Sequence, residues 1–136
     1  MSEAKQELVL SWLQKATTDL SAARLLSKSE ETFLETALYH CQQAAEKALK
    51  GFLVYCDTRV KKTHNIGLLL EHAAEIEPAF RTWAEAATRL TRFATEYRYP
   101  GLALPPTEEV CREAIDDAHS ILNQVLSFLP SEAHPN

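Results

Sequence analysis

The chain contains 136 residues, of which 46% are hydrophobic and 24% are charged, as in an ordinary globular domain and unlike a disordered chain. Its 3 glycines and 6 prolines are too few for an all-β protein, which needs a turn about every 8–12 residues. The 14 Lys and Arg residues stand against 19 Asp and Glu residues, so the net charge is −5. This balance excludes a protein that coats nucleic acid through general basicity, but it is compatible with a local basic cleft.

Several features of the sequence indicate the cellular compartment in which the protein is expected. The first residues carry no apolar stretch, so no secretory signal is expected. The longest apolar runs, such as residues 52–56, are far shorter than the roughly 20 residues of a membrane-spanning helix. The cysteines, Cys41, Cys56 and Cys111, are odd in number and lack CxxC spacing, which favours reduced thiols over a disulfide framework. We therefore expect a soluble cytoplasmic protein that does not enter a membrane.

Helical periodicity dominates the first half of the chain. Apolar residues recur at every third or fourth position over about 5–28 and again over about 33–56. Ser29, Glu30 and Glu31 separate these two predicted helices. A connection this short favours an antiparallel helix pair.

Capping and helix-breaking residues predict the secondary structure in the middle of the chain. Residues 57–64 hold charges and no apolar pattern, so they are predicted to form a loop. Asn65 is a suitable N-cap for a short helix that ends near Ile76. Pro78 ends this short helix, and a third long helix is predicted to follow it and to run to about Glu96.

The last helix is predicted between a breaker cluster and a proline. Residues 98–106 contain three prolines and a glycine, and Thr107 is placed to cap a helix whose apolar stripe ends at Leu129. The predicted fold is all-α: an antiparallel up-down four-helix bundle with one additional short helix. We expect an ordered core over about 5–129 and a polar C-terminal tail over 130–136.

Familiar catalytic and ligand-binding motifs do not occur in the sequence. It contains no GxGxxG, no GxxxxGK[ST], no HExxH and no CxxC, which are the marks of dinucleotide, P-loop and common zinc sites. We therefore expect no metal and no cofactor, and no DNA-binding motif is seen.

The second predicted helix carries the first candidate site. Lys47 and Lys50 lie three residues apart on one face, where they could hold a phosphate. The alternative is that Lys50 forms an ordinary surface pair with Glu46, at i,i+4 spacing. The same helix has a face of small side chains that would let another helix approach closely: Ala44, Ala45 and Ala48.

A second candidate site lies in the predicted loop. Lys61, Lys62, Thr63 and His64 come just before a predicted helix N-terminus, where free backbone N–H groups attract anions. His64 could serve as a hydrogen-bond donor, a general acid or a ligand-positioning group. The alternative is a local cap that only orders the loop.

A third candidate site lies at the end of the third predicted long helix. Arg98 stands between Tyr97 and Tyr99, and Pro100 keeps Tyr99 out of helical geometry. An arginine between two phenol rings suits phosphate binding or base stacking. The alternative is a rigid helix terminator in which Arg98 satisfies backbone carbonyls.

Taken together, four segments resemble the HEPN family of small helical proteins. They are the W-x3-A-x2-D-L-x2-A-x-L-L pattern over 12–26, the Q-A-A-E-K-A-L-K stretch over 43–50, Thr63-His64-x-Ile66, and Arg98-Tyr99-Pro100. The resemblance covers nearly the whole chain in the right order and identifies residues 1–136 as a single HEPN-like domain. It implies an antiparallel four-helix bundle, commonly a homodimer, with a nucleotide or RNA site in a cleft. Relatives often carry an acidic residue after the Arg-Tyr-Pro triplet, whereas this chain has Gly101.

The residue types and the resemblance together give the predicted function. Some relatives pair with minimal nucleotidyltransferases, often in toxin–antitoxin systems, so the expected protein is a dimer that binds a nucleotide, an RNA phosphate or such a partner. The candidate ligand-binding residues are Lys47, Lys50 and Arg98 for phosphate contact, His64 for hydrogen bonding and Tyr99 for ring stacking. An alternative is a non-catalytic interaction module that docks through the alanine face.

A metal-independent endoribonuclease is the enzymatic alternative. The ribonuclease branch of the family uses an Arg and a His separated by four to six residues, and this chain has two formal matches, Arg59 with His64 and Arg112 with His119. A chain with this many Arg and His residues gives about 0.8 such matches by chance. The catalytic candidates are therefore only these two pairs, and the binding role is favoured over catalysis.

Overall fold

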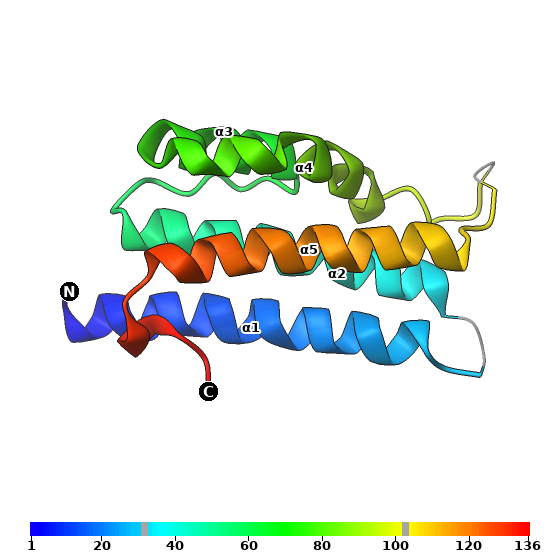
Figure 1. Cartoon of the computed structure of the whole chain (residues 1–136), viewed down its shortest axis with the longest axis horizontal. Coiled ribbons are helices and arrows are strands. Elements are labelled where there is room, and N and C mark those ends of the chain that lie inside the picture. The colour runs from blue at the N-terminus through cyan, green and yellow to red at the C-terminus, as the bar shows by residue number, and fades with distance from the viewer. Residues whose placement is uncertain (31–32, 102–103) are drawn as a thin grey trace.

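The computed structural model describes residues 1–30, 33–101 and 104–136, and every regular element within them is a helix (Figure 1). The α-helices are α1 (Glu3–Ser27), α2 (Leu34–Tyr55), α3 (Ile66–Ile76), α4 (Ala84–Thr91) and α5 (Glu108–Phe128), and the 3-10 helices are η1 (Pro78–Trp83), η2 (Arg92–Ala94) and η3 (Ser131–Ala133). The predicted all-α fold is confirmed. Glu31, part of the expected break between the first two helices, lies outside the described residues.

The helices form three layers around α2 (Figure 1). α1 lies along one side, α2 and α5 occupy the middle, and α3 and α4 cover the opposite side. α2 contacts α1, α3, α4 and α5, and it runs antiparallel to α1. Because α2 is the central helix, the groups on its polar side can be reached by side chains from both outer layers.

Side-chain caps fix the starts of α3 and α5. The Oδ1 atom of Asn65 accepts a hydrogen bond from the backbone N–H of Leu68 at 3.1 Å, and the Oγ1 atom of Thr107 accepts one from Val110 at 3.1 Å. Each satisfies a backbone donor that has no partner within its helix. Both predicted N-caps are confirmed.

The prediction of a continuous third long helix is wrong, because residues 78–94 form η1, α4 and η2 in succession. The side chain of Phe80 in η1 is fully buried, with its ring 4.9 Å from that of Phe52 and 5.5 Å from that of Phe128. The tighter 3-10 turn accompanies this packing. The regular apolar spacing that predicted one helix describes the buried positions but not the change of helix type.

The alanine face of α2 packs inside the chain. Ala44, Ala45 and Ala48 are all fully buried, so this face is not available to dock another protein, and that version of the interaction-module hypothesis is wrong. A close approach of α1 to α2 is shown at Gly51, where a Cβ atom would collide with the side chain of Leu13. Gly51 thus serves the α1–α2 contact.

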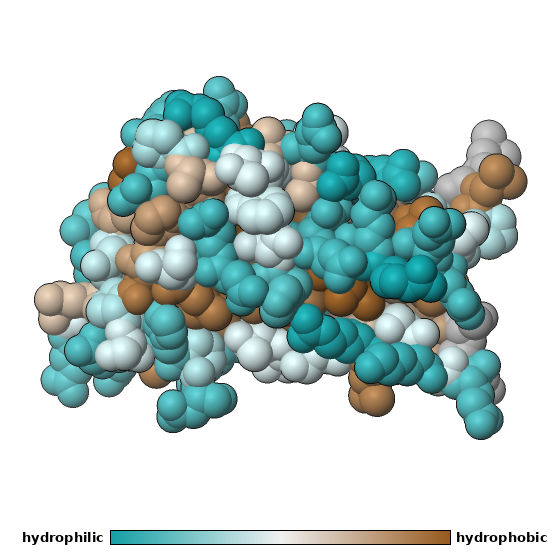
Figure 2. All heavy atoms as spheres, in the orientation of Figure 1, coloured by the Kyte–Doolittle hydropathy of each residue, from teal (hydrophilic) through white to brown (hydrophobic). Residues whose placement is uncertain are grey.

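The C-terminal residues fold back on the bundle. Ala133 is fully buried, and the Nε2 atom of His134 donates to the carbonyls of Leu126 at 2.8 Å and Leu129 at 3.0 Å. The predicted polar tail over 130–136 therefore packs against the bundle in part, with η3 in contact with α1. No described helix has the length and apolar character needed to span a bilayer. On the face that carries α5, hydrophilic side chains predominate and apolar spots are separated (Figure 2).

Candidate functional site

A line of polar side chains runs along one side of α2. We call it the α2 polar stripe, and it consists of Tyr39, His40, Gln43 and Lys47, all of which are half-buried. Gln43 follows Tyr39 by four residues and His40 by three, and Lys47 follows Gln43 by four, so these side chains lie along one side of the helix. From Tyr39 to Lys47 the stripe rises about 12 Å along the helix axis.

A buried carboxylate of α1 holds the centre of the stripe. The Oδ1 atom of Asp19 accepts a hydrogen bond from Nδ1 of His40 at 2.8 Å, and its Oδ2 atom accepts one from Nζ of Lys47 at 2.6 Å. Asp19 is buried, yet both of its oxygens are paired, which offsets the cost of removing the charge from water. Sequence reasoning assigned Asp19 and His40 no role, although a carboxylate in phase with the apolar stripe of α1 is the signal that could have found Asp19.

A second buried carboxylate lies further along α2. Glu46 Oε2 accepts from Nζ of Lys50 at 3.1 Å, and Glu46 Oε1 accepts from Nδ1 of His64 at 2.7 Å and from Nε2 of Gln42 at 3.1 Å. The side chains of Glu46 and Lys50 are only 5% and 10% exposed. The alternative of an ordinary surface pair is therefore wrong, because this i,i+4 pair lies in the interior, where the Lys50 ammonium is 5.9 Å from the centre of the Trp12 ring.

His64 is held in place from three directions. Its side chain donates to Glu46, its backbone carbonyl accepts from Nε2 of Gln42 at 2.8 Å, and the next residue, Asn65, caps α3. The hydroxyl of Thr91 in α4 also accepts from the backbone N–H of Ile66 at 3.0 Å. Even so, the His64 side chain is 69% exposed, so an anchored imidazole presents its other edge, with Nε2, at the surface.

Arg98 lies over an aromatic ring of α2. Its guanidinium carbon is 4.7 Å from the centre of the Tyr39 ring, which is cation–π geometry. Arg98, Tyr39 and Tyr97 also line a hollow of about 290 Å³. Burial and the neighbouring Glu96 raise the pKa of Tyr97. Tyr99 is 70% exposed and lines an adjoining hollow together with Tyr97 and Arg98.

Contacts connect most of the predicted residues without placing them in one cavity. The rings of Tyr39 and His40 lie 5.8 Å apart in an edge-on arrangement, which links Arg98 to the Asp19 cluster. Nε2 of Gln43 donates to Oε1 of Gln42 at 2.8 Å, which links the stripe to Glu46 and His64. Lys47 and Lys50 contact different carboxylates. The hollows beside Lys47 and beside Arg98 have separate linings.

A family model described as the HEPN domain matches residues 9–128. The chain belongs to the HEPN family. The crystal structure of ST0689, described as an archaeal HEPN homologue, is 33% identical with a TM-score of 0.70, and the match covers 88% of this chain and 95% of that one. The crystal structure of TT1696 from Thermus thermophilus is 31% identical with a TM-score of 0.80, and the match covers 89% of this chain and 98% of that one. No curated protein matches the chain significantly.

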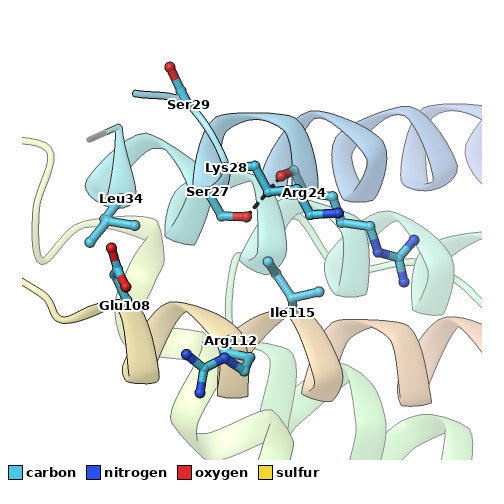
Figure 3. A pocket seen from close by; sticks show the side chains of 8 residues that line it. All are labelled: Arg24, Ser27, Lys28, Ser29, Leu34, Glu108, Arg112 and Ile115. Atoms are coloured by element: carbon cyan, nitrogen blue, oxygen red, sulfur yellow. Dashed lines mark hydrogen bonds between the residues drawn. The ribbon is translucent and has the colours of Figure 1, made fainter. Parts of the chain in front are cut away.

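In this HEPN protein, neither Arg–His pair suggested by the ribonuclease pattern forms a contact in the described residues. Nδ1 of His119 accepts from the Arg24 guanidinium at 3.0 Å, and its Nε2 lies 2.9 Å from the amide of Asn123. Arg112 lines a hollow between α1 and α5 whose lining also includes Arg24 (Figure 3). Arg59 is exposed in the loop before His64, whose Nδ1 is bonded to Glu46.

The cysteines of this HEPN protein are not activated nucleophiles. Burial raises the pKa of Cys41, and the neighbouring Cys111 and Asp117 raise it further. Burial also raises the pKa of Cys111 and of Cys56. A raised pKa reduces the thiolate fraction at neutral pH. All three cysteines are free thiols, as the sequence predicts, with Cys41 and Cys111 buried and Cys56 partly exposed.

Proposed function

We propose that this HEPN protein binds a phosphate-bearing ligand, a nucleotide or RNA, along the α2 polar stripe, and that it does so as a homodimer in the cytoplasm. One observation carries the proposal. A continuous series of contacts runs from Arg98 through Tyr39, His40 and Asp19 to Lys47, and a hydrogen bond from Gln43 connects this stripe to the Glu46–His64 cluster.

The two buried carboxylates give this surface its physical character. Asp19 and Glu46 each fix a lysine and an imidazole, so the outward N–H bonds of Lys47 and the outward ring nitrogens of His40 and His64 are held in place before a ligand arrives. Pre-organised donors lose less side-chain entropy on binding than mobile ones do. The lysine ammonium of Lys47 has two further N–H bonds after its bond to Asp19. These are the donors we assign to a phosphate.

Arg98 and its rings supply the other half of the proposed interface. A guanidinium binds a phosphate through two parallel hydrogen bonds, and exposed aromatic rings stack with bases regardless of sequence. Tyr99 is exposed enough to stack, and Tyr39 supports Arg98 from below. We therefore assign phosphate contact to Lys47 and Arg98, hydrogen bonding to His64 and stacking to Tyr99. Lys50 is buried against Glu46, so we assign it the task of holding that carboxylate.

The proposal includes a protein partner. The family resemblance suggests a second copy of the chain and a minimal nucleotidyltransferase of a toxin–antitoxin type of system. Sedimentation equilibrium tests the homodimer, and co-expression with a nucleotidyltransferase encoded beside this gene tests the partner. A monomer at micromolar concentration, or failure of the two proteins to co-purify, would remove that part of the proposal and leave the ligand site standing.

Fluorescence anisotropy with a short labelled single-stranded RNA, competed by ATP and by GTP, tests the ligand site. We expect Lys47→Met and Arg98→Met each to weaken binding by about ten-fold, the loss of one charge-assisted hydrogen bond. Arg81→Met is the matched control, because Arg81 is an exposed arginine on η1 that makes no contact with the stripe among the described residues. Equal affinity of all three variants, or no binding of RNA or nucleotide by the wild type, would refute the proposal.

A further inference from the structure

The two imidazoles of the candidate site are held in the same way. Nδ1 of His40 lies 2.8 Å from a carboxylate oxygen of Asp19, and Nδ1 of His64 lies 2.7 Å from a carboxylate oxygen of Glu46. Both carboxylates are buried, and they belong to different helices, Asp19 to α1 and Glu46 to α2. Each ring therefore has one nitrogen bonded to a buried anion and the other nitrogen on its far edge.

The carboxylates determine which ring nitrogen carries a proton. An ionised carboxylate only accepts hydrogen bonds, so Nδ1 of each ring is the donor. A neutral imidazole has a single N–H, which leaves Nε2 as an unprotonated acceptor. Nε2 gains an N–H only when the ring takes up a second proton. The side chains of His40 and His64 are 29% and 69% exposed, so both rings can exchange protons with the solvent.

A second proton changes what these rings do to an anion. The lone pair of an unprotonated Nε2 repels a phosphate oxygen, whereas the N–H of an imidazolium donates a charge-assisted hydrogen bond to it. Histidine ordinarily changes its charge between about pH 5 and 8, and lysine and arginine ordinarily keep theirs throughout that range. Of the donor types assigned to the α2 polar stripe and the Glu46–His64 cluster, the imidazoles are thus the ones that a moderate change of pH switches.

The charged groups around His40 come from three parts of the chain. Asp19 of α1 contacts the ring directly, and Lys47 of α2 contacts the other oxygen of that carboxylate. Arg98, which follows α4 and η2, lies over the ring of the neighbouring Tyr39. A carboxylate favours a charged imidazole and cations oppose it. The carboxylate is in direct contact with His40, and the cations are one contact further away.

His64 has a similar environment. Glu46 contacts the ring directly, and Lys50 contacts the other oxygen of that carboxylate. The exposed Lys61 and Lys62 come before His64 in the loop, and α4 contributes the uncharged hydroxyl of Thr91 to the adjoining backbone. Again a buried carboxylate is the group in direct contact. A phosphate on the outer edge of the ring would place a second negative charge beside it.

We propose that anion binding along the α2 polar stripe is coupled to protonation of His40 and His64, so that affinity rises as the pH falls from about 8 to about 5.5. The inference rests on the function proposed above and adds its regulation by pH. The Nδ1 bond to the carboxylate can form in both protonation states, so a proton adds an outward donor to a ring that is already oriented. By linkage, the bound anion promotes proton uptake to the same extent.

Anisotropy titrations of the full chain with a labelled oligouridylate that has hydroxyl ends test the coupling. The phosphodiesters of this probe keep one negative charge each between about pH 5.5 and 8, so the protein is the partner that titrates. We expect affinity to rise by about ten-fold for each ring that is protonated, the gain of one charge-assisted hydrogen bond. Binding with a constant affinity would overturn the coupling and leave the phosphate site standing. No binding at any pH would overturn both proposals.

Asparagine variants locate the protons. His40→Asn and His64→Asn each keep an amide N–H that can donate to the carboxylate, but the amide does not titrate. We expect each variant to bind like the wild type at about pH 8 and about ten-fold more weakly than the wild type at about pH 5.5. His72→Asn is the matched control, because His72 is half-buried on α3 and bonds to neither carboxylate among the described residues. An unchanged pH dependence in both site variants, or an equal loss in His72→Asn, would overturn the proposal.

Calorimetry of the wild type provides a measurement that does not depend on the folding of any variant. The heat of binding is measured at about pH 6.5 in buffers that differ in ionisation enthalpy, which gives the number of protons taken up with the ligand. We expect net proton uptake when the oligouridylate binds. Binding with no proton uptake, or with proton release, would contradict the coupling.

Discussion

Glu46 and His64 are 18 residues apart in the sequence, and their side chains form a 2.7 Å hydrogen bond in which a buried carboxylate anchors an exposed imidazole. The same carboxylate accepts from Lys50 and Gln42. Since Gln42 also bonds to the backbone carbonyl of His64, the loop before α3 is tied to α2 at both the main chain and the side chain. Glu46 is therefore the group on which the position of His64 depends.

Glu46→Gln is expected to destabilise the fold by about 3 kcal/mol, because it leaves the Lys50 ammonium buried without a counter-charge. Urea unfolding measures the change. The control is Asp57→Asn, which removes the partner of Lys5 in a pair where Asp57 is exposed, and which should cost less than about 1 kcal/mol. Equal small effects of the two substitutions would show that the Glu46 pair behaves as a surface pair.

Gly51→Ala is expected to destabilise the fold by about 1–3 kcal/mol, although alanine is the better helix former. The added methyl group would collide with the side chain of Leu13 and lie 3.1 Å from Cβ of Trp12, so α1 and α2 must move apart. Gly67→Ala is the matched helical control, since the nearest atom to its new Cβ is the Asn65 side-chain oxygen at 3.3 Å, which needs to shift by only a few tenths of an ångström. A thermal melt in which Gly51→Ala raises the Tm would contradict this packing.

Stability is expected to fall as the pH rises above about 9. Burial raises the pKa of the Cys41 and Cys111 thiols, so the folded chain retains protons that the unfolded chain, with thiol pKa values near 8.5, releases. The stabilising contribution is complete below the unfolded pKa and is lost as the pH rises through the folded values. Urea unfolding between pH 7.5 and 10 measures it, and ultraviolet thiolate absorbance checks its cause. Thiolate appearing at the same pH in native and urea-unfolded protein would exclude this explanation.

Tyr39→Phe is expected to leave RNA affinity within about two-fold of the wild type, whereas Tyr39→Ala weakens it by about two- to five-fold. The Arg98 guanidinium lies over the ring face, and an exposed cation–π contact contributes about 0.5–1 kcal/mol. The phenylalanine variant keeps the ring and removes only the hydroxyl. Anisotropy titrations of both variants decide the matter, and a loss in Tyr39→Phe equal to that in Tyr39→Ala would assign the effect to the hydroxyl.

The sequence predicts the helices better than it predicts the site, for a physical reason. The caps at Asn65 and Thr107 are local interactions between residues three apart, so residue type alone is enough to predict them. The 3-10 segment around Phe80 escaped prediction because it depends on packing against Phe52, which is distant in the sequence.

The same distinction applies to the candidate site. His64 and Arg98 can be recognised in the sequence because neighbouring residues set their local geometry. His64 comes just before a helix N-terminus, and Arg98 lies two residues before Pro100. Asp19 did not stand out, since its role depends on His40 and Lys47, which lie 21 and 28 residues away. The depth at which Glu46 and Lys50 are buried likewise depends on how α1 and α3 cover α2, which an i,i+4 spacing cannot show.

Chemical-shift mapping by heteronuclear NMR, with short single-stranded RNA added to the isotopically labelled chain, tests the central claim most directly. We expect the signals of His40, Gln43, Lys47 and His64, together with the Arg98 side chain, to shift with one common affinity. We expect those of Asn123 and Ser127 on the exposed side of α5 to stay in place. Shifts confined to α5, or to the hollow around Arg112, would contradict a phosphate-binding surface along the α2 polar stripe.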